Sequence, residues 1–344
     1  MNPLKIFLLP FALLFELITY YRFRFYNMPI GKKRVQFKVP VIVVGNITVG
    51  GTGKTPHIEF LGNFLTSKYQ TAFLSRGYGR KSKGFIEVSE ESTATKVGDE
   101  MLQVFTKFKD KATCYVGESR VEAIRKILTQ QPSTQLCLLD DAYQHLPLKA
   151  STYILLTDYD RLFTKDFVLP MGLLRESRSA GKRADMVIVT KCPSTISEKE
   201  RDEVSQQISK YTNAPIWFST MVSSLSEGGD SLAEGADVVC VSGIAQNGQF
   251  IDHLSKRFTI NESFQYKDHH AFTIDEVTAM VEYCRKHQLP MITTQKDYMR
   301  LLQPEFGELI GKIAIFVVQI EVKLLGNEQS FWSTIIDEVE KCHK

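Results

Sequence analysis

Val39-Pro-Val-Ile-Val-Val-Gly-Asn-Ile-Thr-Val-Gly-Gly-Thr-Gly-Lys-Thr-Pro56 is the stretch of sequence that decides the fold. It begins as a β-branched apolar run, continues as a glycine-rich turn, and leads into apolar residues at helical spacing. This order predicts a buried strand, a loop and an amphipathic helix. Glycines in such a loop let backbone N–H groups converge on an anion at the N-terminus of the helix. The stretch therefore predicts a phosphate-binding loop.

One residue departs from the usual pattern G-x-x-x-x-G-K-[ST], because Thr48 stands where its first glycine is expected. The order of strand, turn, Gly-Lys-Thr and helix is kept, so we favour the phosphate loop over a chance Gly-Lys-Thr in an ordinary turn. Lys54 would add a positive charge and Thr55 a hydroxyl for Mg²⁺. The residues predicted to bind the nucleoside triphosphate, which the family resemblance described below implies is ATP, are Thr48, Val49, Gly50, Gly51, Thr52, Gly53, Lys54 and Thr55.

A second apolar run, Leu136-Cys-Leu-Leu139, leads directly into Asp140 and Asp141. A carboxylate just beyond a buried strand, beside the strand that carries the phosphate loop, can hold a nucleotide-bound Mg²⁺. The pair therefore supplies the acidic strand end that a phosphate loop requires. The sequence does not say which aspartate contacts the ion.

Composition limits the class of protein. With 344 residues, 43% hydrophobic and 24% charged, the chain is long enough for two globular domains. A formal net charge of +3 is too small to indicate nucleic acid as a partner. The six cysteines are widely spaced and form no C-x-x-C motif, so we expect reduced thiols rather than a disulfide framework.

The N-terminal segment, residues 1–35, is unusually apolar. Its charge-free run from Ile6 to Phe15 is far shorter than the roughly 20 residues that cross a bilayer. Tyrosines alternate with arginines after it, as in the interfacial belt of a membrane-bound helix. We expect the segment to lie on a membrane; a helix packed on the protein's own core is the alternative.

Alternating strand and helix patterns predict an α/β fold with a P-loop NTPase-like, mostly parallel sheet, a second, smaller α/β lobe and an N-terminal membrane-associated helix. Composition changes to Ser, Gly and Glu around residues 219–236, which predicts a linker. The expected domains are a core at 36–218 and a smaller domain at 237–344. We expect a cleft between them.

Two further segments carry polar groups beyond predicted strands or at helix starts. Arg76-Gly-Tyr-Gly-Arg80 follows a strand predicted at 71–75 and is either part of the ligand crevice or a solvated basic turn. Asp99 precedes a helix with apolar residues on one face, and it is either an N-cap or a catalytic group. The sequence alone leaves both alternatives open.

Missing motifs narrow the reaction. A GTPase would carry D-x-x-G and N-K-x-D, but Tyr143 lies three residues after Asp140, and Val189-Thr-Lys-Cys-Pro193 lacks the asparagine and the aspartate. A motor or transporter ATPase would normally couple to repeats or partner subunits, and the sequence shows no sign of either. A kinase for a small molecule or a lipid remains.

The motifs together closely resemble the tetraacyldisaccharide 4′-kinase (lipid A 4′-kinase) family. The resemblance runs along almost the whole chain. Departures from the family pattern are Met101, Ser177 and Gln295, which concern fine geometry. The motifs that carry it are Val44-Gly-Asn-Ile-Thr-Val-Gly-Gly-Thr-Gly-Lys-Thr-Pro56, Ser75-Arg-Gly-Tyr-Gly79, Val97-Gly-Asp-Glu100, Leu139-Asp-Asp-Ala-Tyr-Gln-His145, Leu174-Arg-Glu176, Asp268-His269 and Lys296-Asp297.

This resemblance implies transfer of the ATP γ-phosphate to the 4′-hydroxyl of an acylated glucosamine disaccharide 1-phosphate, at the cytoplasmic face of the bacterial inner membrane. It implies that Asp99 accepts the hydroxyl proton beside His269, a residue of the second lobe, so that closure of the lobes completes the site. The other implied roles are catalysis for Lys54 and Arg175, Mg²⁺ binding for Thr55, Asp140, Asp141 and Glu176, and substrate binding for Arg76, Tyr78, Arg80 and Gln144.

Two rival functions stay open from the sequence. One is a kinase for another membrane-bound glycolipid or polyprenyl acceptor. The other is a nucleotide-dependent, membrane-associated switch without an acceptor. The fate of the γ-phosphate separates them, because a switch releases inorganic phosphate whereas a kinase labels a lipid.

Overall fold

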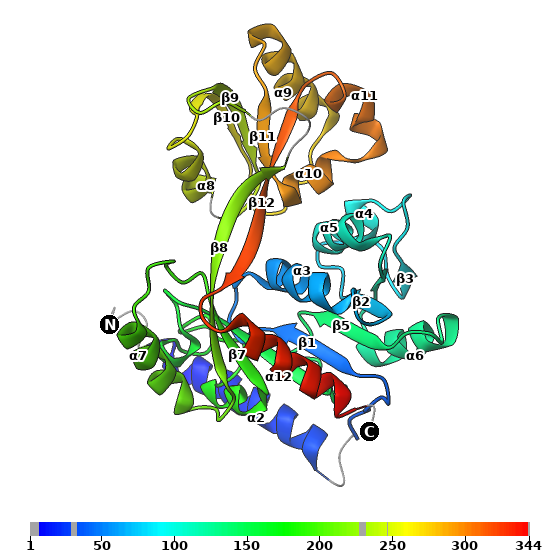
Figure 1. The fold of residues 1–344 in the computed structure, drawn as a ribbon, viewed down its shortest axis with the longest axis vertical. Coiled ribbons are helices and arrows are strands. Elements are labelled where there is room, and N and C mark those ends of the chain that lie inside the picture. The colour runs from blue at the N-terminus through cyan, green and yellow to red at the C-terminus, as the bar shows by residue number, and fades with distance from the viewer. Residues whose placement is uncertain (1–6, 29–32, 227–231, 246, 343–344) are drawn as a thin grey trace. The chain divides into compact units, whose positions relative to one another are not determined.

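The computed structural model describes residues 7–28, 33–226, 232–245 and 247–342. The chain forms two compact units (Figure 1). Unit 1 consists of Met1–Arg76, Phe108–Val222 and Val322–Lys344, and unit 2 of Gly77–Lys107 and Ser223–Glu321. Each unit has its own parallel sheet, as the sequence predicts for an α/β fold.

The sheet of unit 1 has the strand order β8-β7-β6-β1-β5-β2-β4, and its pairings are parallel. A parallel sheet has helices on its faces, so its strands are buried on both sides, and β1 and β5 are buried along their whole lengths. The strands are β1 (Val41–Gly45), β2 (Thr71–Ser75), β4 (Thr113–Val116), β5 (Leu136–Asp140), β6 (Thr152–Asp158), β7 (Met186–Thr190) and β8 (Ile216–Ser226), the last of which continues into unit 2.

Two helices of unit 1 begin with a serine that caps the first turn. Ser119 caps α6 by accepting a hydrogen bond from the Glu122 backbone N–H, and Ser197 caps α7 through a capping box with Glu200. The helices are α2 (Leu9–Asn27), α3 (Lys54–Leu65), α6 (Arg120–Gln130), α7 (Glu198–Ser209) and α12 (Glu328–Glu340), with 3₁₀ turns η1 (Phe163–Lys165) and η2 (Arg178–Arg183).

Unit 2 contains a smaller parallel sheet in the order β10-β9-β11-β12. Its core joins β9 and β11 to α9 through buried residues such as Val241, Met280 and Met291. The elements are β3 (Ile86–Glu87), α4 (Ala94–Val97), α5 (Asp99–Phe108), β9 (Asp237–Ser242), α8 (Asn247–Leu254), β10 (Thr259–Gln265), α9 (Ile274–His287), β11 (Met291–Thr294), α10 (Gln295–Leu301), η3 (Pro304–Phe306), α11 (Gly307–Ile310) and β12 (Ile315–Leu324).

The compact units do not coincide with the predicted domain boundaries. Residues 77–107 belong to unit 2 although the sequence places them inside the 36–218 core, and residues 322–344 return to unit 1. The first difference has a physical cause, because side chains of α10 bind those of α5 through ion pairs. A contact between segments two hundred residues apart leaves no local signal in the sequence.

The predicted linker at 219–236 begins inside a strand. Residues 216–226 form β8, whose first part pairs with β7 at Val187↔Ile216. The serines that suggest a loop extend a run of β-formers, Ile-Trp-Phe-Ser-Thr-Met-Val, and Ser219 is fully buried. Residues 227–231 of the predicted linker, and 1–6 and 29–32 of the predicted N-terminal segment, lie outside the described residues.

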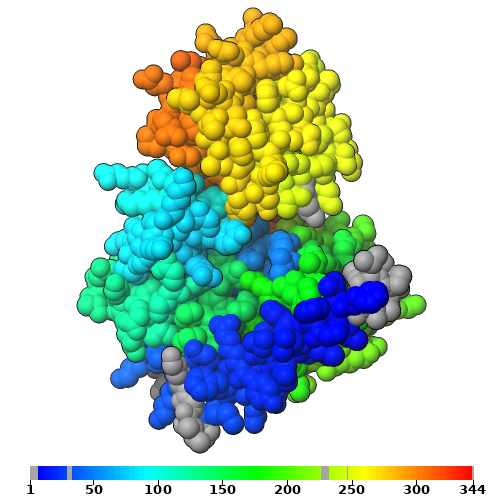
Figure 2. All heavy atoms as spheres, turned by 180° about the vertical axis from the view of Figure 1, so that it is seen from behind, coloured from blue at the N-terminus to red at the C-terminus, as the bar shows by residue number. Residues whose placement is uncertain are grey.

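Helix α2 runs along the surface of unit 1, where it is the darkest blue in Figure 2. Ala12 is its buried residue, and its large apolar side chains are mostly exposed. Phe23 lies under the Arg183 guanidinium, whose carbon is 5.2 Å from the ring centroid. The exposure disfavours the alternative of a helix packed on the protein's own core. Among the described residues, no helix has the length and apolar character needed to cross a bilayer.

The C-terminal residue of β1 supplies a stability test. A Cβ on Gly45 would lie 2.7 Å from the Tyr143 Cβ and 3.2 Å from its backbone nitrogen, and neither atom can move easily. We expect Gly45→Ala to lower the free energy of unfolding by about 1–3 kcal/mol, measured by urea denaturation. The matched control is Gly51→Ala, whose Cβ would meet no atom within 4 Å. Equal stability of the two variants would contradict the close packing at Gly45.

Candidate active site

The loop between β1 and α3 has a conformation that requires glycine. Gly50 and Gly53 have φ angles of 103° and 80°, in the region that side chains disfavour, and Gly53 is the N-cap of α3. Buried Asn46 closes the loop, since its Nδ2 donates to Thr52 Oγ1 at 2.8 Å. The loop therefore joins the end of a buried strand to the N-terminus of a helix, the geometry that suits an anion.

A buried histidine links the glycine loop to strand β8. His57 Nδ1 lies 2.7 Å from the Gly53 carbonyl oxygen, and Nε2 lies 2.9 Å from Ser219 Oγ on β8. Burial lowers the pKa of His57 to about 4, against the hydrogen bond to Gly53, so the ring is neutral at pH 7. A neutral ring donates from Nδ1 to Gly53 and accepts at Nε2 from Ser219. This relay fixes the helix start against the sheet.

Asp140 and Asp141 lie at the end of β5, which pairs with β1 in the register Val44↔Asp140. The acidic strand end is thus beside the loop strand, as predicted. The Asp141 backbone N–H donates to the Val44 carbonyl at 3.0 Å, and its φ of 47° turns the side chain out of the strand direction. Lys54 Nζ is 3.7 Å from Asp141 Oδ2.

Three cations surround Asp141. Arg175 donates to both carboxylate oxygens, from Nη2 to Oδ1 at 3.0 Å and from Nη1 to Oδ2 at 3.3 Å. Arg120, itself buried, donates to the Asp141 carbonyl at 3.2 Å. Burial alone would raise the pKa of Asp141, but Lys54 and Arg175 outweigh it and lower that pKa. The carboxylate is therefore ionised at neutral pH.

The predicted metal contact Glu176 is engaged elsewhere. Arg183 donates to both of its carboxylate oxygens, at 2.6 and 2.9 Å, and the side chains of the pair are about nine-tenths buried. Gln144 Nε2 donates to Glu176 Oε1 at 2.9 Å and to the Asn46 carbonyl at 2.8 Å. Gln144 and Glu176 thus connect the loop to the segment before β7.

The sequence did not reveal two cations on the loop. Lys191 Nζ donates to the Gly51 carbonyl at 2.6 Å and pairs with Asp158 Oδ2 at 2.8 Å. Arg161 donates to the Val49 carbonyl at 3.2 Å. Lys191 follows β7 and Asp158 ends β6, so their positions at strand ends were the signal available. Buried Arg120, at the start of α6, gave no such signal.

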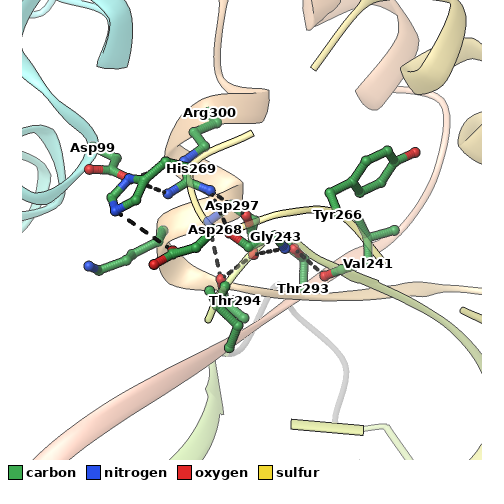
Figure 3. Close-up of polar contacts among 12 residues, drawn as sticks. Asp99, Val241, Gly243, Tyr266, Asp268, His269, Thr293, Thr294, Asp297 and Arg300 are labelled. Atoms are coloured by element: carbon green, nitrogen blue, oxygen red, sulfur yellow. Dashed lines mark hydrogen bonds and ion pairs between the residues drawn. The ribbon is translucent and has the colours of Figure 1, made fainter. Parts of the chain in front are cut away.

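Asp99 and His269 form a second cluster, within unit 2 (Figure 3). Asp99 is the first residue of α5, and its Oδ1 accepts from the Glu100 backbone N–H at 2.9 Å. Its Oδ2 accepts from Arg300 and lies 3.4 Å from His269 Nδ1. The aspartate therefore bonds to the helix start and joins a buried charge cluster. The sequence predicts the two residues in separate domains, whereas the structure groups both in one unit.

Charges in this cluster control its protonation. Burial alone would raise the pKa of Asp99, but the hydrogen bond from His269 and the charges of Arg300 and Lys296 lower it well below its usual range. The hydrogen bond with Asp99 raises the pKa of His269, against partial burial. Asp99 is ionised at neutral pH, and His269 titrates above its ordinary range.

The basic loop predicted for substrate is divided between the units. Arg76 ends a segment of unit 1, whereas Tyr78 and Arg80 belong to unit 2. The exposed Tyr78 ring meets the His269 ring edge-on, with centroids 5.2 Å apart. Arg80 Nη2 donates to the Gly84 carbonyl at 2.7 Å. Tyr78 thus contacts the Asp99 cluster through His269.

The oxygen atoms near the glycine loop determine whether a metal ion fits there. Among the described residues, no group of three or more His, Cys, Asp or Glu side chains is arranged to hold a metal. Thr55, in the first turn of α3, and the two aspartates at the end of β5 supply oxygen donors. Hydroxyl and carboxylate oxygens are donors that Mg²⁺ accepts, and the ion usually takes only one or two carboxylates in nucleotide sites.

Unit 1 is an α/β unit in which a glycine loop and an acidic neighbour lie at the carboxyl ends of parallel strands, the edge where open α/β sheets commonly bind ligands. The family model for tetraacyldisaccharide-1-P 4′-kinase (LpxK) matches residues 4–340. Proteins named tetraacyldisaccharide 4′-kinase from Flavobacterium johnsoniae and Flavobacterium psychrophilum are 38% and 39% identical, each over 99% of this chain and 99% and 98% of their own lengths. The chain belongs to the tetraacyldisaccharide 4′-kinase family.

A solved structure resembles this chain over 98% of its length. The crystal structure described as the "apo" form of LpxK from Aquifex aeolicus in complex with ATP superposes with a TM-score of 0.76 at 28% identity. It covers 98% of this chain and 99% of its own. The α/β fold with a mostly parallel sheet is therefore the fold of this family.

The depressed pKa of Asp99 predicts how stability depends on pH. A carboxylate with a folded-state pKa below its ordinary value of 3.8 stabilises the fold above that pH and loses the contribution as pH falls. We expect Asp99→Asn to make the free energy of unfolding fall less steeply below about pH 4. Urea denaturation across this range measures the slope. Asp252→Asn, at an exposed aspartate of unit 2, should keep the wild-type slope. If Asp99→Asn kept the wild-type pH dependence of the free energy of unfolding, the depressed pKa of Asp99 in the folded state would be contradicted.

Proposed function

We propose that this chain transfers the γ-phosphate of ATP to the 4′-hydroxyl of a tetraacylated glucosamine disaccharide 1-phosphate, the lipid A 4′-kinase reaction of lipopolysaccharide biosynthesis. The observation that carries the proposal is the family match over residues 4–340, which includes both the glycine loop and the Asp99 cluster. A switch without an acceptor has no use for a proton-accepting pair such as Asp99 and His269, so the kinase is the better account of the two clusters.

The reaction divides between the clusters. At the loop, backbone N–H groups of Gly50, Gly51 and Gly53 and the Lys54 ammonium would hold the β- and γ-phosphates. Arg175, which already faces a carboxylate, would stabilise the charge of the transferred group. Positioning and charge stabilisation supply most of the catalysis in phosphoryl transfer.

The proton of the acceptor hydroxyl would be taken up by the Asp99–His269 cluster. As the hydroxyl oxygen bonds to the γ-phosphorus, the bond from that phosphorus to the bridging oxygen breaks and ADP departs. The hydroxyl proton passes to the pair formed by Asp99 and His269. Asp99 is 4% exposed and ionised, so it suits the buried side of the pair, while His269, with 29% of its side chain exposed, suits the substrate side.

Mg²⁺ would be held by the Thr55 hydroxyl and by a carboxylate of the Asp140–Asp141 pair. The ion, when bound, neutralises charge that develops on the phosphates. Glu176 was predicted to contribute as well. Because Arg183 occupies both of its oxygens, we instead assign Glu176 to holding Gln144, and through it the loop.

Direct detection of the product tests the function. Full-length protein with γ-labelled ATP and an acylated disaccharide 1-phosphate should produce labelled lipid, with the phosphate located at the 4′ position by mass spectrometry. Lys54→Ala should lower kcat by about 10²-fold or more, because it removes a fixed charge from the transferring phosphates. The exposed control Lys199→Ala on α7 should keep wild-type turnover. Release of inorganic phosphate without labelled lipid would exclude the kinase.

Helix α2 fits an enzyme whose acceptor stays in a bilayer. Its exposed side chains include several large apolar residues, together with arginines, a composition suited to the interface of an anionic membrane. We place the enzyme at the cytoplasmic face of the inner membrane, where ATP is available. The exposed large apolar and aromatic residues at 7–28 are Phe7, Leu9, Phe11, Leu13, Leu14, Leu17, Ile18, Tyr20, Tyr21, Phe25 and Met28.

A triple variant tests the helix without deleting it. Phe11, Leu14 and Ile18 share one face of α2 and are 62%, 55% and 57% exposed, so replacing all three with serine should leave the fold intact. We expect the variant to lose co-flotation with vesicles that contain anionic lipid, while ATP binding persists. Arg22→Glu with Arg24→Glu should weaken binding to anionic vesicles only. Unchanged flotation of the triple variant would contradict membrane binding through α2.

A further inference from the structure

Arg300 is the central residue of the buried cluster in unit 2, and none of the predicted roles includes it. It lies on α10, is 5% exposed, and uses its whole guanidinium (Figure 3). Nε donates to Asp99 Oδ2 at 3.0 Å, and Nη2 donates to the same oxygen. Nη1 donates to Asp297 Oδ1 and to the Gly243 carbonyl, each at 2.9 Å. One planar fork therefore joins the proposed proton acceptor to the sheet.

The other end of this fork is rigid. Asp297 is fully buried, and its Oδ2 accepts from the Gly243 backbone N–H at 3.0 Å and from Thr294 Oγ1 at 2.6 Å. Thr294 is also the N-cap of α10, so the start of the helix and the turn after β9 share one carboxylate. Arg300 thus projects from a fixed base, and its position determines where Asp99 Oδ2 lies.

Arg300 also reaches His269. Its Nη2 is 3.1 Å from His269 Nδ1, while Asp99 Oδ2 is 3.4 Å from the same nitrogen. Nδ1 can satisfy only one of them, because it donates to Asp99 when it carries a proton and accepts from Arg300 when it does not. The arginine therefore competes with the aspartate for control of the histidine. The nitrogen that carries the ring proton depends on this competition.

We propose that Arg300 is a positioning residue for phosphoryl transfer, which holds Asp99 Oδ2 in place and sets the proton state of His269. The inference rests on the proposed function, in which these two residues take up the proton of the acceptor hydroxyl. Arg300 acts through the pair and does not itself touch the reacting atoms.

The surrounding charges agree with this role. Asp99 faces Lys296 and Asp297 on α10 and His269 from the loop after β10, where His269 also meets Asp268; on its own helix it accepts from the Glu100 backbone N–H. Lys296 is paired with Glu100. Burial raises the pKa of Asp297, partly offset by its hydrogen bonds and by Arg300. The arginine charge lowers the pKa of His269, opposing the two aspartates. Its removal should therefore raise that pKa.

Full-length Arg300→Gln and Arg300→Lys test the inference, with Arg285→Gln, an exposed arginine of α9, as the matched control. In Arg300→Gln we expect kcat at pH 7 to fall by about tenfold or more, and the acid limb of the kcat profile to move to higher pH. The KM for ATP should change by less than about twofold, because the loop residues are unaltered. Arg300→Lys keeps the charge but not the fork, so it should lose rate with a smaller shift of the limb.

A spectroscopic measurement separates positioning from simple stability. NMR of ¹⁵N-histidine-labelled protein, with His269→Gln to assign the signal, should show a higher His269 pKa in Arg300→Gln than in wild type. An unchanged pKa and acid limb, with kcat falling only as the folded fraction falls, would overturn the inference. Should Arg300→Gln not fold, wild-type kcat and an unshifted limb in Arg300→Lys would overturn it equally.

The proposed function fails by a different result. Full turnover in Asp99→Asn and His269→Gln would remove the proton-accepting role of the pair, whatever the arginine variants do to the His269 pKa. A second outcome would remove the Arg300 inference alone. In it, Asp99→Asn and His269→Gln lose turnover, but neither Arg300 variant changes kcat, the acid limb of the pH profile of kcat or the His269 pKa. The proposed function would then stand.

Discussion

A carboxylate that is partly or fully withdrawn from water keeps its charge where cations face it, and both clusters of this chain follow that constraint. In unit 1, Lys54 and Arg175 hold Asp141 ionised at the edge of the sheet. In unit 2, Arg300 and His269 do the same for Asp99. Lys54 is carried by α3 and Arg300 by α10, and each of these helices has its own packing. The charges that face Asp141 and Asp99 therefore do not depend on flexible surface segments.

The constraint also explains the order of elements at the loop. Parallel strands end at the same edge of a sheet, so β1 and β5 bring the glycine loop and the two aspartates together without a connecting turn. Arg175 reaches that edge from the segment after β6, and its backbone N–H is fixed by the Ile47 carbonyl at 2.7 Å. A ligand at this edge meets donors that are already ordered, which lowers the cost of binding and of charge development.

Sequence patterns predicted this arrangement where the signal is local. The β-branched run before Gly45, the helix after Gly53 and the apolar strand before Asp140 follow from period and propensity, and the structure confirms each of them as β1, α3 and β5. The roles of the site residues stay predictions, although the structure does place Asp141 beside Lys54 and Asp99 beside His269.

What the sequence could not predict rests on contacts between distant segments. Arg300 and Asp99 are 201 residues apart, and an arginine on an ordinary helix gives no sign that it will be buried. The same contact draws residues 77–107 out of the predicted core domain. The serines of β8 misled for a related reason, since the buried Ser219 hydroxyl is satisfied by groups distant in the sequence, the His57 ring and the Val189 carbonyl.

The grouping of Asp99 with His269 has a consequence for how the enzyme can be tuned. Residues 77–107 lie between β2 and β4 in the chain, two strands of unit 1, yet they fold with unit 2. Under the proposed function, one compact unit would therefore organise proton uptake and the other would organise phosphate binding. A change in the charges around Asp99 can alter the pH dependence of the rate while leaving the nucleotide loop unaltered. Substitutions in α10 should thus act on the chemical step, and substitutions behind the loop, at His57 or Ser219, on nucleotide affinity.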